Sequence, residues 1–128
     1  MQYVKYLNIP YKYRGVSKDG LDCIGLCQLI AKDNGVNIGN INYDNIELEK
    51  VYVVFGYNII NKSKYKAVEP NKDALVVFRV MGKIQHVGYM ISDTKFLHIM
   101  EGTRVTMDSI KSPIWEKRIV GYYEYIGK

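Results

Sequence analysis

The spacing of apolar residues divides the chain into a helical first part and a strand-rich second part. From residue 23 to residue 34 the apolar positions recur at helical spacing, which predicts a helix with one buried face. Asp22 is a good N-cap, and Asn34-Gly35 supplies a stop in which Gly35 can adopt a left-handed conformation. Cys23 therefore falls in the first turn of this helix.

From residue 73 onward the pattern changes to the alternation of strands. We expect strands over residues 74–81, 84–91, 95–100, 103–107 and 117–126, most of them joined by tight turns. A helix followed by such a meander predicts an α+β fold, with the helix packed on a mostly antiparallel sheet of five to six strands.

Two other stretches are less regular. Residues 44–61 favour a helix over a strand, because Ile46, Tyr57 and Ile60 fall near helical spacing. Residues 1–7 fit either a short helix or an extended arm. No repeat or low-complexity linker interrupts the chain, so we expect one domain over residues 1–128.

The only two histidines lie on the second and third expected strands. If Ile91 pairs with Lys95 across a three-residue turn, paired positions sum to 186 and Gly88 faces His98. His86 then shares a sheet face with His98 as its diagonal neighbour, about 7–8 Å away between Cβ atoms. A turn one residue shorter or longer would put the two side chains on opposite faces.

Cys23 is the candidate nucleophile. The unpaired N–H groups and the positive end of the helix dipole stabilise a thiolate in the first turn, and the same N–H groups could hold an oxyanion. A cysteine is more often a small buried hydrophobe, and the two histidines could be unrelated core residues. The residue types alone do not decide between these interpretations.

A resemblance favours catalysis. The chain resembles the NlpC-type cysteine peptidases, papain-like enzymes of bacterial cell walls, in three segments. The active-site segment is matched by Pro10-Tyr11, Gly15, Ser17, Gly20, Asp22-Cys23 and Gly25-Leu26; the strands by His86-Val87-Gly88-Tyr89-Met90 and Lys95-Phe96-Leu97-His98; and the closing strand by Trp115 to Gly121. The resemblance covers residues 10–125 except 36–68.

The resemblance implies a role for each matched residue. Cys23 would be the nucleophile, His86 the general base and His98 the residue that orients the base. Tyr11 would lie beside Cys23 and assist the oxyanion or the substrate, and Asp22 would help to recognise the peptide besides capping the helix. The implied reaction is hydrolysis of γ-D-glutamyl-diamino acid bonds in peptidoglycan stem peptides, without a cofactor or metal.

One difference from the usual family sequence leads to a prediction of where the protein acts. Ile24 stands where the family usually has serine, and a bulky residue there is similar to the phage tail branch of the family. We therefore expect a tail-associated cell-wall hydrolase whose partners are the stem peptide and other phage tail proteins. We expect it to be made in the bacterial cytoplasm, because residues 1–10 do not resemble a signal peptide, and to reside in the virion.

Composition excludes several classes of protein. The formal charge of +5 comes from scattered lysines rather than a basic run interleaved with aromatics, so we expect no nucleic-acid partner. No segment approaches the roughly 20 apolar residues of a membrane span, so we expect no membrane association. Cys23 and Cys27 are one helical turn apart, which is poor geometry for a disulfide.

Three alternatives remain open at this point. Cys23, Cys27 and the two histidines form a complete ligand set for a Cys2His2 zinc-binding module. The chain could instead be a structural tail-assembly protein that keeps the fold with little activity. It could also be an amidase or acyltransferase for another substrate, because one fold supports several chemistries.

Overall fold

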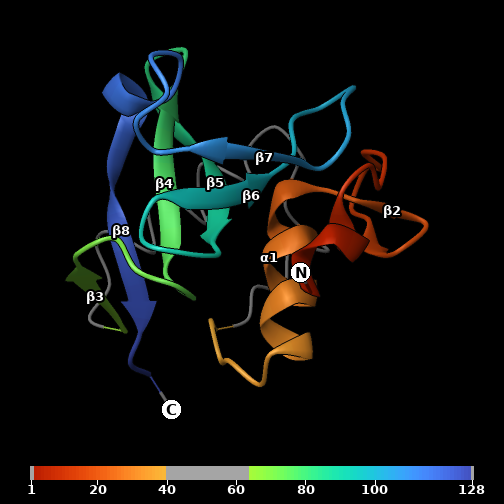
Figure 1. Ribbon diagram of the computed structural model, residues 1–128, viewed down its shortest axis with the longest axis horizontal. Coiled ribbons are helices and arrows are strands. Elements are labelled where there is room, and N and C mark those ends of the chain that lie inside the picture. The colour runs from red at the N-terminus through yellow and green to blue at the C-terminus, as the bar shows by residue number, and fades with distance from the viewer. Residues whose placement is uncertain (1, 40–63, 128) are drawn as a thin grey trace.

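The computed structural model describes residues 2–39 and 64–127, in which an α-helix lies against a six-stranded antiparallel sheet (Figure 1). The sheet order is β3-β8-β4-β5-β6-β7, and the expected α+β fold is confirmed. In chain order the elements are the 3₁₀ helix η1 (Gln2–Tyr6), strands β1 (Val16–Ser17) and β2 (Gly20–Leu21), helix α1 (Cys23–Asp33), strands β3 (Tyr65–Val68), β4 (Leu75–Val80), β5 (Lys83–Met90), β6 (Lys95–His98) and β7 (Thr106–Ser109), the 3₁₀ helix η2 (Glu116–Arg118) and strand β8 (Ile119–Tyr125).

Both ends of α1 form as the sequence predicts. Asp22 is the N-cap, and its Oδ1 accepts a hydrogen bond of 2.6 Å from the Gly25 N–H. Gly35 follows the C-cap Asn34 with φ +69°, the left-handed conformation that glycine adopts without a steric penalty. The helix therefore begins at Cys23 because the cap fixes it there.

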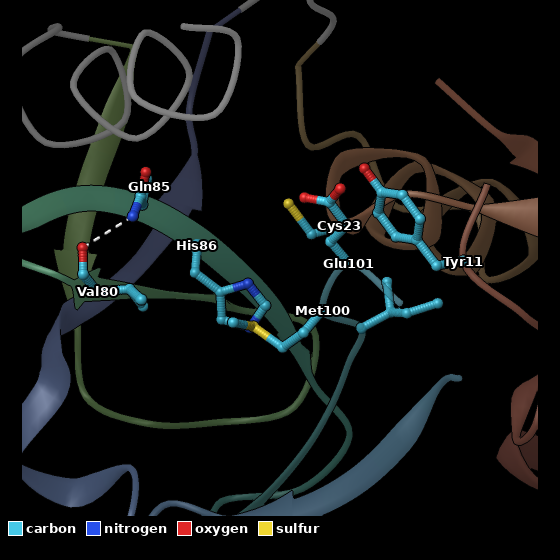
Figure 2. A pocket seen from close by; sticks show the side chains of 8 residues that line it. Tyr11, Cys23, Val80, Gln85, His86, Met100 and Glu101 are labelled. Carbon is cyan, nitrogen blue, oxygen red and sulfur yellow. Dashed lines mark hydrogen bonds between the residues drawn. The ribbon is translucent and has the colours of Figure 1, made fainter. Parts of the chain in front are cut away.

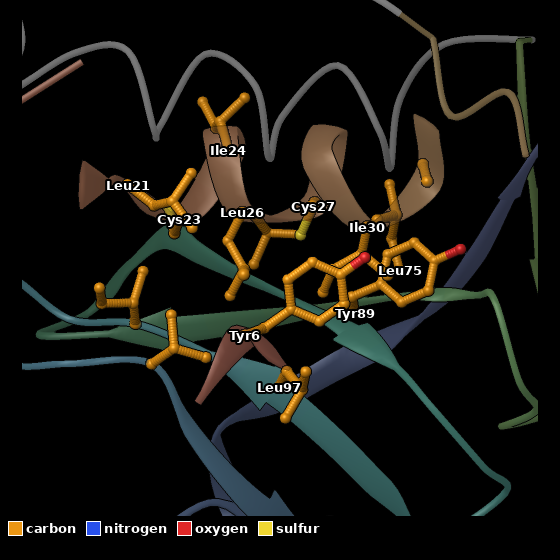
Figure 3. Packing of buried hydrophobic residues seen from close by; sticks show 14 of the residues in the cluster. Tyr6, Leu21, Cys23, Ile24, Leu26, Cys27, Ile30, Leu75, Tyr89 and Leu97 are labelled. Atoms are coloured by element: carbon orange, nitrogen blue, oxygen red, sulfur yellow. The ribbon is translucent and has the colours of Figure 1, made fainter. Parts of the chain in front are cut away.

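The buried face of α1 covers one face of the sheet. Leu26, Cys27 and Ile30 are fully buried and point toward the strands that carry Tyr89 and Leu97 (Figure 3). Each large side chain buried in this way stabilises the fold by roughly 1.5–3 kcal/mol. This packing anchors α1, so that the start of the helix is held at a fixed place beside the sheet.

The register between β5 and β6 is the one on which the argument about the histidines depends. Tyr89 pairs with Leu97 and Met90 with Phe96, so paired positions sum to 186 as predicted. The N–H of Ile91 donates to the Lys95 carbonyl at 2.9 Å and closes the turn.

The strand predicted over residues 103–107 is shifted, because β7 begins only at Thr106. Residues before it bond to the N-terminal segment instead of to β6. The Asn8 N–H donates to the Val105 carbonyl, the Val105 N–H to the Ile9 carbonyl, and the Tyr11 N–H to Thr103. This pairing between distant segments delays the start of β7 and is not visible in the local pattern.

Two further differences concern the chain from residue 65 onward. The first residues of the strand predicted over 117–126 form η2, because the Arg118 N–H donates to the Trp115 carbonyl at 2.8 Å. Strand β3 was not predicted; it pairs with the far C-terminal strand, Tyr65 opposite Tyr125. Residues 2–6, for which the pattern allowed a short helix or an arm, form η1. The helix favoured over residues 44–61 lies outside the described residues.

Strand β4 is irregular against both of its neighbours at Phe78. Opposite β5, Phe78 pairs with His86 and Arg79 with Ile84, which leaves Gln85 as an extra residue in β5. The pairing of β4 with β8 shifts at the same place. Such bulges strengthen the twist of a sheet and redirect side chains, and in Figure 1 β6 and β7 run across the direction of β4 and β8. The bulge at Gln85 lies directly before His86.

Within the described residues, no helix has both the length and the apolar character needed to cross a membrane.

Candidate active site

A pocket of about 160 Å³ lies where the start of α1 meets β5 and the segment after β6. Its lining comprises Tyr11, Cys23, Val80, Gln85, His86, Ile99, Met100 and Glu101. Figure 2 shows the side chains of Cys23 and His86 on facing sides of it. The structure thus brings together three residues that the sequence predicted for the site: Tyr11, Cys23 and His86.

Cys23 lies at the point where the pairing of β5 and β6 ends. The ladder between them covers Tyr89 and Met90 on β5, and the pocket opens beyond it. The backbone N–H groups of Val87, which follows His86, of Ile24 and of Cys23 itself act on the Cys23 sulfur and lower the pKa of its thiol. The thiol therefore meets backbone donors from both the helix start and the sheet.

His86 and His98 lie on the same face of the sheet, as the parity argument predicted. His86 Nε2 is 2.9 Å from His98 Nδ1, which is hydrogen-bonding distance. Because Nε2 of His86 is engaged by His98, Nδ1 is the ring nitrogen left to face the pocket and the thiol. His86 and His98 are only 5% and 3% exposed, so solvent does not compete for the hydrogen bond between the two rings.

Aromatic rings fix the two imidazoles in place. Trp115 stacks on His86 at a centroid distance of 5.7 Å and meets His98 edge-on at 4.8 Å. Phe78 packs at 5.1 Å from His86, and Phe96 at 4.8 Å from His98. Offset and edge-to-face contacts of this kind favour defined ring orientations, so the rotamers of both histidines are set by packing.

Burial favours the uncharged forms of the His86 imidazole and the Cys23 thiol. It lowers the pKa of His86 to about 3, with the neighbouring His98 contributing in the same direction. Burial also raises the pKa of the Cys23 thiol, and the Asp22 carboxylate adds to this, while hydrogen bonds from backbone N–H groups lower it. The stabilisation of a thiolate that the helix start alone predicts is thus opposed by burial, and the thiol needs a base.

The structure adds residues that the sequence did not single out. Asp108 of β7 contacts the far nitrogen of His98, with Oδ2 2.7 Å from Nε2. Glu101 lines the pocket beside Tyr11 and Cys23 (Figure 2). Glu101 lies just before the segment whose pairing was mispredicted, and Asp108 lies just after it. Only the register of β6 with β7, in which Phe96 pairs with Asp108, reveals the contact of Asp108 with His98.

A cysteine at the start of α1, faced by a histidine on β5, is the arrangement that the resemblance in the sequence implies. The family model described as the NlpC/P60 family matches residues 8–124. The chain belongs to the NlpC/P60 family.

Curated relatives in the family carry names of cell-wall enzymes. The chain is 26% identical over 118 residues to the murein DD-endopeptidase MepS/murein LD-carboxypeptidase of Escherichia coli, covering 91% of this chain and 56% of the relative. It is 28% identical over 116 residues to a probable endopeptidase NlpC homolog of Haemophilus influenzae, covering 90% and 55%. The chain therefore spans about half the length of these relatives.

Solved structures of the family share the fold. An NlpC/P60 family protein from Bacillus cereus has a TM-score of 0.66 at 23% identity, covering 95% of this chain and 37% of that one. The NlpC/p60 domain of the peptidoglycan hydrolase SagA has a TM-score of 0.59 at 17% identity, covering 96% and 92%.

Two glycines in the segment that resembles the family are required by close backbone contacts. A Cβ at Gly25 would collide with the carbonyl oxygen of Gly15, and a Cβ at Gly15 would collide with that of Gly20. The Asp22 N–H donates to the same Gly15 carbonyl at 3.1 Å. These contacts hold the loop against the first turn of α1, beside Cys23.

Asp22 itself is fully buried. The N-cap role predicted from the sequence is present, whereas recognition of a peptide by Asp22 remains a prediction. Ile24 is also fully buried and packs in the helix-side core (Figure 3), so its side chain does not line the pocket.

The zinc alternative is not supported by the geometry. Cys27 lies in the core between α1 and the sheet, whereas the rings of His86 and His98 pack with the cluster of Phe78, Phe96 and Trp115. In the part of the chain that the structure describes, no three His, Cys, Asp or Glu side chains are placed to share a metal ion.

Proposed function

We propose that this chain is a cysteine peptidase that hydrolyses amide bonds in peptidoglycan stem peptides. The observation that carries the proposal is the pairing of Cys23 and His86 across one pocket, with His86 oriented by His98. The membership of the family and the names of the relatives, which include a murein endopeptidase, support this choice of substrate.

The reaction begins with transfer of the Cys23 proton to Nδ1 of His86 as the sulfur attacks the scissile carbonyl carbon. The carbonyl oxygen becomes an oxyanion, for which backbone N–H groups at the start of α1 and the Tyr11 hydroxyl are the proposed donors. The C–N bond then breaks, and His86 returns the proton to the leaving amine.

Water completes the cycle. His86 takes a proton from the water as its oxygen attacks the thioester, the C–S bond breaks, and the proton passes back to the sulfur. The product is a carboxylic acid, which loses its proton to the solvent and becomes a carboxylate, and Cys23 returns to the thiol. His98 takes part by keeping the lone pair of His86 directed at the pocket.

We also propose the finer assignments made from the resemblance: a γ-D-glutamyl-diamino acid bond as the scissile bond, and a phage tail as the place of action. The second rests on Ile24 following the nucleophile. Because the Ile24 side chain is buried, it contributes packing rather than a contact with the peptide. Mass spectrometry of purified particles of a phage that encodes this chain tests the assignment to a phage tail. Absence of the protein from the particles would contradict that assignment.

Digestion of purified peptidoglycan tests the activity. Sacculi of the diaminopimelate and lysine types are incubated with the wild-type protein, Cys23→Ala and Cys27→Ala, and released fragments are identified by mass spectrometry. We expect new amino termini at the diamino acid with the wild type and with Cys27→Ala, and none with Cys23→Ala. Activity in Cys23→Ala, or a wild type inert on both substrates, would contradict the proposal.

A further inference from the structure

The histidine pair continues into a third polar group. Asp108 on β7 and His98 on β6 are diagonal neighbours on one face of the sheet, because Asp108 pairs with Phe96 and His98 with Thr106. Asp108 Oδ2 lies 2.7 Å from His98 Nε2, and the Asp108 side chain is 33% exposed. Two consecutive hydrogen bonds therefore join His86, which lines the pocket with Cys23, through His98 to Asp108 near the surface.

We propose that Asp108 is a positioning residue that sets the tautomer of both histidines and thereby makes His86 a base toward Cys23. The proposal rests on the proposed function, since it assigns a role in that reaction. Asp108 does not touch the substrate or the reacting atoms in this arrangement, and it acts through His98.

The hydrogens can be placed one after another along these two hydrogen bonds. A carboxylate only accepts hydrogen bonds, so the nitrogen of His98 that faces Asp108 must carry the hydrogen. Neutral His98 then has a lone pair on Nδ1, which accepts the Nε2–H of His86 at 2.9 Å. Neutral His86 consequently has its lone pair on Nδ1, on the pocket side, where it can take the thiol proton.

Without the carboxylate the opposite arrangement becomes available. His98 could carry its hydrogen on Nδ1 and donate to His86 Nε2, which would leave His86 with an N–H toward the thiol. An imidazole in that tautomer cannot accept the proton of Cys23. The packing of Phe96 and Trp115 around His98 fixes the ring plane but not the position of the hydrogen, so this choice depends on Asp108.

The same contact stabilises the charge that forms during catalysis. When His86 becomes an imidazolium, its Nε2–H polarises His98, whose own N–H points at the Asp108 carboxylate. The contact with Asp108 also opposes the lowering of the His98 pKa by burial. A hydrogen bond to a charged group is stronger than one between neutral groups. The hydrogen bonds from His86 through His98 to Asp108 therefore stabilise the transition state, in which His86 becomes charged, more than the state in which His86 is neutral.

Asp108→Asn tests the proposal, because asparagine has the same shape and offers a donor as well as an acceptor. We expect kcat on peptidoglycan fragments to fall by about 10- to 100-fold, less than the loss of a general base itself, with KM and the melting temperature little changed. Asp93→Asn is the matched control: Asp93 is an exposed residue of the turn between β5 and β6, and its replacement should leave kcat unchanged.

A double-mutant comparison separates positioning from a general structural effect. His98→Phe keeps an aromatic ring in the packed site but has no nitrogen to transmit the tautomer. In that background Asp108→Asn should change the residual kcat by less than about twofold, since the connection is already broken. A loss that persists undiminished beside His98→Phe, or full kcat in Asp108→Asn alone, would overturn the proposal.

Alkylation of Cys23 by iodoacetamide gives a readout that needs no substrate. We expect Asp108→Asn to slow alkylation of Cys23 at pH 7 by about tenfold and to leave Cys27 unaffected. The thiolate is the form that reacts, and His86 in the other tautomer cannot take the proton of the thiol. If the wild type fails to cleave peptidoglycan but this dependence is found, the proposed function fails and the positioning role stands. If cleavage is found and alkylation does not depend on Asp108, the positioning role fails alone.

Discussion

Replacement of Asp22 by alanine should destabilise the fold and, at the same time, make Cys23 more acidic. Asp22 is fully buried, and its Oδ1 accepts a hydrogen bond of 2.6 Å from the Gly25 N–H in the first turn of α1. The same carboxylate raises the pKa of the Cys23 thiol. One side chain therefore stabilises the helix while opposing thiolate formation.

The loss of stability follows from the cap. Removal of an N-cap acceptor costs roughly 0.5–2 kcal/mol, and a buried N–H left without a partner costs about 1–3 kcal/mol. Both figures describe the same lost bond and are not added, so we expect about 2 kcal/mol for Asp22→Ala. With an unfolding entropy of roughly 2.1 cal/mol/K per residue over the 128-residue chain, this lowers Tm by about 7 °C.

Asp22→Asn is the control that separates the two effects. Asparagine still accepts a bond from the Gly25 N–H, so we expect a loss below about 1 kcal/mol, while the charge near the thiol disappears in both variants. Urea unfolding followed by circular dichroism measures the stability, and the rate of Cys23 alkylation at pH 7 measures the acidity. Equal stability of Asp22→Ala and the wild type, or slower alkylation in both variants, would refute this reasoning.

Two further predictions concern the cysteines and the buried histidine. Cys27→Ala should lower the free energy of unfolding by about 1–2 kcal/mol, because Cys27 is completely buried in the core, and should leave the activity intact. Cys23→Ala should abolish activity with a smaller change in stability. Urea unfolding and peptidoglycan digestion of both variants check these two expectations. The folded-state pKa of His86 is about 3, below the ordinary 6.5, so between these values the unfolded chain binds a proton that the folded chain does not. The contribution of His86 to stability should therefore be fully present above pH 6.5 and fall as the pH decreases toward 3, by at most about 1.4 kcal/mol per pH unit. Urea midpoints measured from pH 7 to pH 4 should fall less steeply for His86→Gln than for the wild type. Equal slopes for the two proteins would contradict the contribution of His86.

The features that the sequence predicted well are those fixed by neighbouring residues. The start of α1 follows from the capping side chain of Asp22, and its end from Gly35. The shared face of His86 and His98 follows from a three-residue turn, because the turn length sets the register and the register sets which side chains share a face.

The features that the sequence missed are those fixed by contacts between distant segments. Strand β7 begins late because residues 103–105 bond to the N-terminal segment, and this displacement concealed the contact of Asp108 with His98. Strand β3 is short and pairs with the last strand of the chain, so its own four residues carry little signal.

The sequence by itself therefore determined the position of Cys23 at a helix start, the two strands that carry the histidines and the shared face of their side chains. Only the tertiary structure decided how these parts meet: the parting of β5 and β6 that admits the Cys23 thiol, the burial that favours the uncharged thiol and imidazole, and the hydrogen bonds from His86 through His98 to Asp108. Capping and turn geometry depend on a few adjacent residues, whereas burial and cross-strand contacts depend on which distant segments the whole chain brings together.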